Sequence, residues 1–182
     1  AMDDMNLSFS TLNQYDAVLF YTDSSNGSDP NNGNVLADFA DTGKRLVVCT
    51  FSWANQGGNT LSGRFISDGY SPFVLQGSSL YSNSTMNYND GSVYFNGVNV
   101  LEAYYRDTVA ATAGSIERAT WASGHPLLAQ KDNVFGLNLF PRLYPGNMND
   151  LQNLLINLLQ EGGCTDNDGD GVSCGDCDDG NP

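Results

Sequence analysis

The hydrophobic pattern is clearest between residues 15 and 53. Two apolar runs, at 17–21 and 46–51, flank a polar loop and an amphipathic segment at 35–41. Runs rich in Val and Leu without polar alternation are typical of strands covered on both faces, as in a parallel sheet. The apolar residues of the amphipathic segment share one helical face, and Gly43 can end the helix in the left-handed conformation. The pattern predicts a strand, a helix and a parallel strand joined by a right-handed crossover.

The stretch from residue 52 to residue 92 has no clear period. It is rich in glycine and carries scattered aromatic residues. A structureless segment of this length is uncommon inside a compact domain, so it would be functional, cover the sheet or hide short strands. We expect a cover over the sheet.

The rest of the chain returns to recognisable patterns. Short apolar stretches predict strands, with a helical turn as the alternative for the second, at 93–95, 100–105, 115–121, 127–129 and 134–140. The last two would pair as a hairpin. Leucines then recur at helical spacing over 148–159 before Gly162 and Gly163 stop the pattern, which predicts a helix lying across the sheet.

Composition narrows the class of protein. The chain has 182 residues, of which 40% are hydrophobic, enough for one domain with a sizeable core. It has no apolar run of about 18 residues, so we expect no membrane span. Its 7 basic residues stand against 21 acidic ones. This balance argues against nucleic-acid binding, because phosphate neutralisation needs clustered Lys and Arg.

The cysteines divide into two groups. Cys49 lies inside an apolar run and is predicted to be a buried core thiol. Cys164, Cys174 and Cys177 lie in a Gly/Asp-rich tail, where a disulfide or a metal would have to replace a core. One disulfide among the three would leave one thiol over. This cysteine usage, with the low Lys content, predicts a secreted, extracellular or cell-surface protein.

The tail carries the most specific pattern in the chain. Asp166, Asp168 and Asp170 alternate before Gly171, so three carboxylates can converge on one hard cation while the glycine supplies the bend. Cys177 stands where an EF-hand has its bidentate Glu, so Asp176, Asp178 or Asp179 would complete the shell. Oxygen ligands favour calcium. The alternatives are zinc bound through Cys174 and Cys177, and a disordered acidic tail.

Several blocks of the body resemble a known family. The blocks QYDAVLFYTDSS, GNVLADFADTGKRLVVCTFSW, GRFISDGYSPF and ATWASGHPLLAQKDNVFGLNLFP, with the closing leucine-rich helix, are similar to the class I glutamine amidotransferase-like domains of secreted bacterial proteins. The resemblance spans residues 12–160. It implies an α/β, flavodoxin-like three-layer sandwich with a mainly parallel sheet, so that 1–161 form this domain and 162–182 the metal-binding tail.

The body departs from that family at its start. In the family a further strand and helix precede the first strand seen here, whereas only about 14 residues precede it in this chain. Either the sheet lacks its first strand-helix unit and leaves one edge open, or that unit comes from another chain or from a part of the precursor outside this sequence. An open edge invites pairing, so self-association or another protein chain is expected there.

A second departure concerns catalysis. Active members of the family carry a cysteine in a glycine-flanked elbow after a sheet strand, but the corresponding residues 50–54 read TFSWA. Cys49 is part of the strand itself, so the elbow cysteine is absent. Ser52 with His125 is the remaining nucleophile and base pair. Asp23, Ser52 and Trp53 would lie beyond the carboxyl ends of strands, where open α/β sheets bind ligands.

The tail has a resemblance of its own. The run CTDNDGDGVSCGDCDDGNP is similar to the short Asp/Cys calcium-binding repeats of secreted bacterial proteins and, more distantly, to the thrombospondin type 3 repeat. The resemblance implies a Ca²⁺ ion as the cofactor, held by Asp166, Asp168, Asp170, the Val172 carbonyl, Asp176 and Asp179.

Two functional classes remain open. The first is a non-catalytic extracellular structural or interaction module with a calcium-binding tail, assembling through the open sheet edge. The second is a hydrolase or carbohydrate-binding domain that uses the crevice near Asp23, Ser52 and Trp53. We expect the first, because the amidotransferase cysteine elbow is absent.

Overall fold

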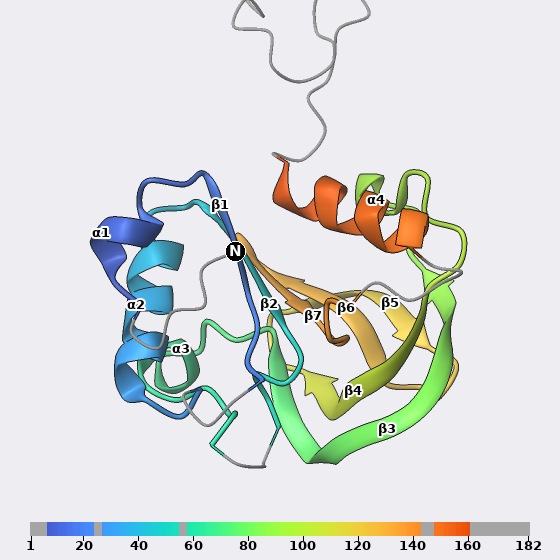
Figure 1. Ribbon diagram of the computed structural model, residues 1–182, viewed down its shortest axis with the longest axis horizontal. Helices are drawn as coiled ribbons and strands as arrows, with labels where there is room; N and C mark the ends of the chain where they lie inside the picture. The colour runs from blue at the N-terminus through green and yellow to red at the C-terminus, as the bar shows by residue number, and fades with distance from the viewer. Residues whose placement is uncertain (1–6, 24–26, 55–57, 143–147, 161–182) are drawn as a thin grey trace, which may run out of the picture.

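The body is built on one seven-stranded sheet with helices on both sides (Figure 1). The structure is a computed structural model and describes residues 7–23, 27–54, 58–142 and 148–160. Its elements, in chain order, are α1 (Phe9–Leu12), β1 (Ala17–Phe20), α2 (Pro30–Asp41), β2 (Arg45–Cys49), α3 (Arg64–Ser67), β3 (Phe73–Asn89), η1 (Val93–Phe95), β4 (Glu102–Ala111), β5 (Ile116–Trp121), β6 (Pro126–Lys131), β7 (Val134–Leu137) and α4 (Met148–Leu159). No helix in these ranges is long and apolar enough to cross a membrane.

The sheet is mixed, so the expectation of a mainly parallel sheet is wrong. Its strand order is β1-β2-β7-β6-β5-β3-β4, and only β1, β2 and β7 run parallel. The other pairings are antiparallel. The cause is the length of the connections: only two residues join β6 to β7, whereas a parallel pair needs a crossover such as α2. The α/β class and the predicted strand-helix-strand unit at the start of the chain are confirmed.

The stretch expected to be an irregular cover contains the longest strand of the protein. Strand β3 has 17 residues and pairs first with β4 and then, through residues 86–89, with β5. Its register with β4 shifts between Leu75 and Ser79 and again between Tyr81 and Ser84. Such bulges bend a strand, and Figure 1 shows β3 as a curved ribbon that turns away from the parallel strands. The bulges also remove the alternation that would have identified the strand in the sequence.

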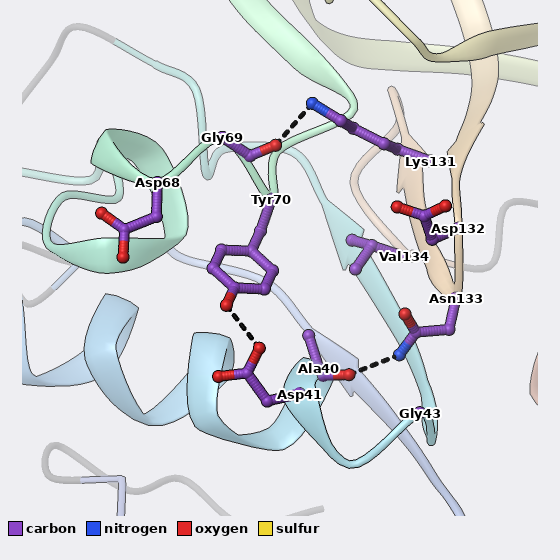
Figure 2. Close-up of a pocket in the computed structure, with 10 residues that line it drawn as sticks. All are labelled: Ala40, Asp41, Gly43, Asp68, Gly69, Tyr70, Lys131, Asp132, Asn133 and Val134. Carbon is purple, nitrogen blue, oxygen red and sulfur yellow. Dashed lines mark hydrogen bonds between the residues drawn. The ribbon is translucent and has the colours of Figure 1, made fainter.

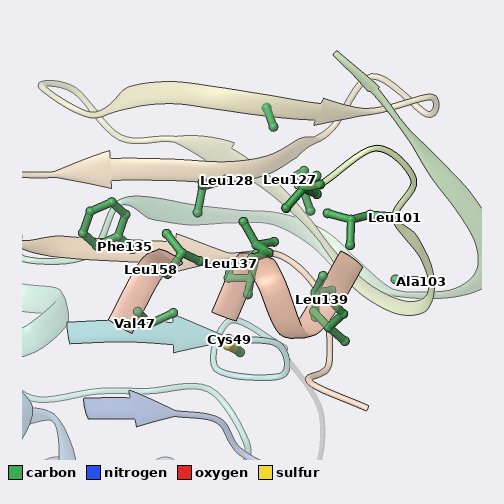
Figure 3. Packing of buried hydrophobic residues seen from close by; sticks show 14 of the residues in the cluster. Val47, Cys49, Leu101, Ala103, Leu127, Leu128, Phe135, Leu137, Leu139 and Leu158 are labelled. Atoms are coloured by element: carbon green, nitrogen blue, oxygen red, sulfur yellow. The ribbon is translucent and has the colours of Figure 1, made fainter. Parts of the chain in front are cut away.

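Two hydrophobic cores fix the layers of the fold. Helices α1, α2 and α3 lie on one side of the sheet and α4 on the other (Figure 1). Along β2, Leu46 and Val48 face the α2 side, whereas Val47 and Cys49 face α4. Figure 3 shows Leu158 of α4 among the strand residues of this second core. The predicted helix across the sheet is confirmed, whereas the strand expected at 93–95 is the short 3₁₀ helix η1.

Strand β1 forms one edge of the sheet. Its inner edge pairs with β2, and within the described ranges no strand pairs with its outer edge. The four apolar residues of β1 are half-buried, whereas those of the neighbouring β2 are buried after Arg45. Part of the β1 surface that a further strand would cover is therefore exposed.

Candidate functional site

The carboxyl ends of β1, β2 and β7 meet at one edge of the sheet, which we call the carboxyl edge. The Phe51 N–H donates to the Thr22 carbonyl at 3.1 Å, which ties the ends of β1 and β2 together. On the other side, the Phe140 N–H donates to the Tyr105 carbonyl at 3.2 Å, so the chain after β7 contacts β4. The curved pair of β3 and β4 therefore folds back onto the ends of the parallel strands.

The Asn138 side chain links β4 to the ends of the parallel strands, an arrangement that we call the closure. Its Oδ1 accepts hydrogen bonds from the Asp107 N–H at 2.7 Å and from the Thr50 hydroxyl at 3.1 Å. Its Nδ2 donates to the carbonyls of Asp107 and Pro126, both at 2.9 Å. The side chain is buried, and its four bonds join β4, the start of β6 and the segment after β2. It satisfies backbone groups that would otherwise be buried without partners.

Asp107 lies inside the same closure, with its side chain fully buried. The Ser79 hydroxyl donates to its Oδ1 at 2.8 Å, whereas its Oδ2 has no partner among the described residues. Burial raises the pKa of this carboxyl to about 6, and hydrogen bonds from Ser79 and from the Trp53 backbone partly offset that rise. A buried acid with no neighbouring cation is costly, and such groups gather at functional sites. Sequence reasoning missed it.

Ser52 and Trp53 reach the carboxyl edge, but both side chains are buried. The Ser52 hydroxyl is fully enclosed and has no hydrogen-bond partner among the described residues. Trp53 donates its Nε1–H to the Ser71 hydroxyl at 3.0 Å and packs edge-on against Phe73, with the ring centroids 5.0 Å apart. Asp23, in contrast, is exposed beyond the end of β1. The structure thus places the three predicted crevice residues at one edge, with only Asp23 at the surface.

The candidate nucleophiles are inaccessible. Cys49 and Ser52 are each 0% exposed. Burial also raises the pKa of the Cys49 thiol far above its usual value, so the thiolate is scarce. The Ser52 hydroxyl makes no hydrogen bond to His125. No nucleophile and base pair is therefore assembled at this edge within the part of the chain that the structure describes.

A cluster of aromatic rings lies next to Asp107 in the fold, because Tyr105, one of its members, precedes Asp107 by two residues on β4. Phe51 packs against Tyr81, Tyr105 and Phe140, with ring centroids 6.2, 5.8 and 5.6 Å away. Three further contacts extend the cluster to the surface, where Tyr21, Tyr81 and Tyr104 are 45%, 48% and 40% exposed. We call these three residues the tyrosine surface. Because the rings come from distant parts of the sequence, no local motif marks the cluster.

A depression of about 500 Å³ lies at the opposite, amino edge of the sheet (Figure 2). Asp41, Asp68 and Tyr70 form one wall, and Lys131 and Asn133 form the other. These walls are tied to the fold: the Lys131 ammonium donates to the Gly69 carbonyl at 2.6 Å, and Asn133 donates to the carbonyls of Ala40 and Lys44. The polar groups of this depression are therefore largely engaged in holding the elements together.

Arg64 neutralises the acids beside that depression. Its guanidinium pairs with the carboxylates of Asp38, Asp41 and Asp68. The Tyr70 hydroxyl also donates to Asp41, and hydrogen bonds from Tyr70 and Arg64 lower the pKa of the Asp41 carboxyl. These groups are half-exposed and mutually paired, unlike Asp107.

The predicted metal site lies outside the described residues. This applies to the calcium ligands Asp166, Asp168, Asp170, Val172, Asp176 and Asp179 and to the disulfide candidates Cys164, Cys174 and Cys177. Within the described ranges, no group of three or more His, Cys, Asp or Glu residues could hold a metal ion.

Comparison with known proteins supports the fold. No protein-family model and no curated protein matches the chain. Among solved structures, it is similar to Cytoplasmic Protein STM1381 from Salmonella typhimurium LT2, with a TM-score of 0.64 and 15% identity over 84% of this chain and 74% of that one. Cytoplasmic Protein STM3548 from Salmonella typhimurium gives 0.63 and 13% over the same shares. A putative ThuA-like protein from Bacteroides uniformis gives 0.57 and 10%, over 86% and 73%. The chain therefore has a ThuA/glutamine amidotransferase-like fold.

The same comparison corrects the expected location. Two of these neighbours are cytoplasmic proteins, which contradicts the prediction of a secreted, extracellular or cell-surface protein. That prediction rested on the tail cysteines and the low Lys content. Neither feature determines a compartment, because cysteines in an acidic tail can bind a metal as well as form disulfides.

Proposed function

We propose that this chain is a non-catalytic interaction module with a calcium-binding tail. The observation that carries the proposal is the burial of both nucleophile candidates, Cys49 and Ser52, where the amidotransferase elbow would lie. A nucleophile must reach the substrate and be activated by an adjacent base. Neither Cys49 nor Ser52 meets these conditions among the described residues of this edge.

The tyrosine surface and the free edge of β1 are the contact regions that support this proposal. Tyrosine offers a large, rigid contact area and a hydroxyl that can hydrogen-bond, and it is enriched at interfaces for that reason. Tyr21 follows β1 directly and belongs to the tyrosine surface, so the two regions are continuous. A partner strand added to β1 would contact Tyr21 as well.

In this proposal the calcium ion binds to the tail. Asp166, Asp168 and Asp170 have the alternate spacing of a calcium loop, and Asp176 and Asp179 would complete the oxygen shell. A metal site gives order to a short Gly/Asp-rich segment that has no core of its own.

Calcium binding by the full chain tests the tail directly. Calorimetry should show a binding isotherm for the wild type, accompanied by a higher Tm, and no isotherm for an Asp168→Ala, Asp170→Ala double variant. An Asp16→Ala, Asp23→Ala double variant removes the same charge from exposed positions in the body and should bind calcium as the wild type does. Absence of binding by the wild type would refute the calcium proposal. Light scattering with and without calcium tests assembly.

A second candidate is a hydrolase or carbohydrate-binding domain at the carboxyl edge. The raised pKa of Asp107, close to Trp53, favours it, because a carboxyl with a pKa near 6 is suited to acid-base chemistry. Any hydrolytic turnover should then vanish in Ser52→Ala. Turnover that persists in this variant would show that Ser52 is not the nucleophile and would still contradict a non-catalytic module. Absence of turnover from the wild type would leave the interaction module.

A further inference from the structure

The pair formed by residues 73–85 of β3 and by β4 closes over the ends of β2 and β7, and we call it the β3–β4 ribbon. Asn138 bonds both backbone groups of Asp107, and Phe140 bonds the Tyr105 carbonyl. The only carboxyl buried inside the described part of this closure is that of Asp107. The hydrogen bonds that attach the ribbon to the segment after β7 therefore lie at the same place as a titratable group, the Asp107 carboxyl.

No described residue supplies a compensating positive charge to Asp107. From β3 it faces the Ser79 hydroxyl, from the segment after β2 the Trp53 backbone, and from the segment after β7 the Asn138 amide. Its neighbours on β4 are Tyr105, which packs against Phe51 and Phe140, and Arg106.

Arg106 is engaged elsewhere. Its guanidinium donates to the hydroxyl of Ser123 and to the carbonyl of Ser82, and it lies over the Trp121 ring. The Arg106 Nε has no partner among the described residues, and it forms no ion pair with Asp107. Within the described part of the chain, no cation balances an ionised Asp107, and only the Ser79 hydroxyl and the Trp53 backbone stabilise its negative charge. The neutral acid suits the closed ribbon, whereas the carboxylate is much better solvated once the ribbon opens.

We propose that Asp107 is a pH-sensitive latch: its neutral carboxyl keeps the β3–β4 ribbon closed over the ends of β2 and β7, and its ionisation loosens that closure. Opening would separate Tyr81 and Tyr105 of the ribbon from Phe51. It would therefore remodel the tyrosine surface and expose the segment that carries Ser52.

The direction of the pH effect follows from the two states of Asp107. The carboxyl has a pKa of about 6 in the closed ribbon, against its ordinary value of 3.8 in an open, solvated one. Between these values the closed form holds a proton that the open form releases, so opening becomes more favourable as pH rises. Above about 6 both forms are ionised and the effect levels off. The opening equilibrium should rise roughly fiftyfold from pH 4 to pH 7.

Hydrogen exchange on the full chain tests the latch. After correction for intrinsic exchange rates, the amides of β4 (102–111) should lose protection by up to about fiftyfold between pH 4 and pH 7, while those of β2 (45–49) change much less. In Asp107→Asn the β4 profile should be flat with pH. Asp90→Asn is a matched control, because Asp90 is paired with Arg118 and its pKa is lowered. This control should keep the wild-type β4 profile.

Ser79→Ala keeps the test decisive if Asp107→Asn fails to fold. Ser79 is one of the two donors that hold down the pKa of Asp107, so its loss should move the β4 transition to higher pH. A β4 profile independent of pH in the wild type would overturn the latch. An unshifted transition in Ser79→Ala would overturn it as well, because the group that titrates would then be another one.

Discussion

The surroundings at the two edges of the sheet shift the pKa values of aspartates in opposite directions. At the amino edge, Asp38, Asp41 and Asp68 are half-exposed and share Arg64. Hydrogen bonds from Tyr70 and Arg64 lower the pKa of Asp41, and hydrogen bonds from Ser67 and Arg64 lower that of Asp68. At the carboxyl edge, Asp107 is fully buried without a cation, and its pKa rises to about 6. The surroundings stabilise the carboxylates at the amino edge, whereas burial destabilises the carboxylate at the carboxyl edge.

This difference distinguishes a cluster of acids with a structural role at the amino edge from a single acid, Asp107, that is a candidate for function at the carboxyl edge. The amino-edge network ties α2, α3 and Tyr70 together with pairs that solvent screens. The carboxyl edge instead keeps an ionisable group in a place where an amide or an apolar side chain would cost less. Proteins retain such groups where a function needs them, and the depression at the amino edge has no comparable feature.

Asn138→Ala should produce the largest effect. It would remove four hydrogen bonds and leave buried groups of Asp107, Pro126 and Thr50 without partners, which should cost on the order of 3–5 kcal/mol. Urea denaturation measures this loss. Asn153→Ala, which removes a solvent-exposed bond to the Gly97 carbonyl, should cost only about 0.5–1 kcal/mol. Equal losses in the two variants would show that Asn138 does not hold the closure.

Replacing an aspartate by asparagine at each edge should have effects of opposite sign. The raised pKa of Asp107 means that its protonation stabilises the folded state fully below about pH 4 and not at all above about pH 6. At pH 7, Asp107→Asn should therefore raise the free energy of unfolding, by about 1–3 kcal/mol after allowing for an unpaired amide. The gain should survive high salt, because the penalty arises from burial.

The matched variant at the amino edge is Asp41→Asn. Its lowered pKa means that the carboxylate stabilises the fold above about pH 3.8, with that stability lost as pH falls. Asp41→Asn should therefore slightly lower the denaturation midpoint at pH 7, and high salt should shrink the loss. The same sign for both variants would remove the contrast between the two edges.

Local patterns allowed the core elements to be predicted from sequence. The apolar runs of β1 and β2 and the leucine spacing of α4 each determine their own element, because burial on both faces or along one stripe leaves a period. The bulges of β3 erased such a period, and short hairpins turned the expected parallel sheet into a mixed one. These errors arise where strand pairing between distant segments decides the structure.

The candidate site was only partly predictable for the same reason. The position of Ser52 and Trp53 after a buried strand predicted that they lie at the carboxyl edge of the sheet, where the structure places them. Asp107 had one usable signal: along β4 it alternates with Ala103 and Val109, both buried, which places it on an inward face. Asn138 and the aromatic cluster had none, because their contacts join segments that lie far apart in the chain.

The smallest effect on stability is expected at the tyrosine surface. Residues that serve the proposed contact function should contribute little to the free energy of unfolding. Tyr104 is 40% exposed, and its ring packs only against Tyr105 among the described aromatic residues. Tyr104→Ser should therefore change the free energy of unfolding by no more than about 0.5 kcal/mol, measured by urea denaturation. Phe51→Ser, which removes the buried centre of the same cluster, should cost several times more. A large loss in Tyr104→Ser would mean that this ring supports the fold, and the tyrosine surface would no longer qualify as a free contact region.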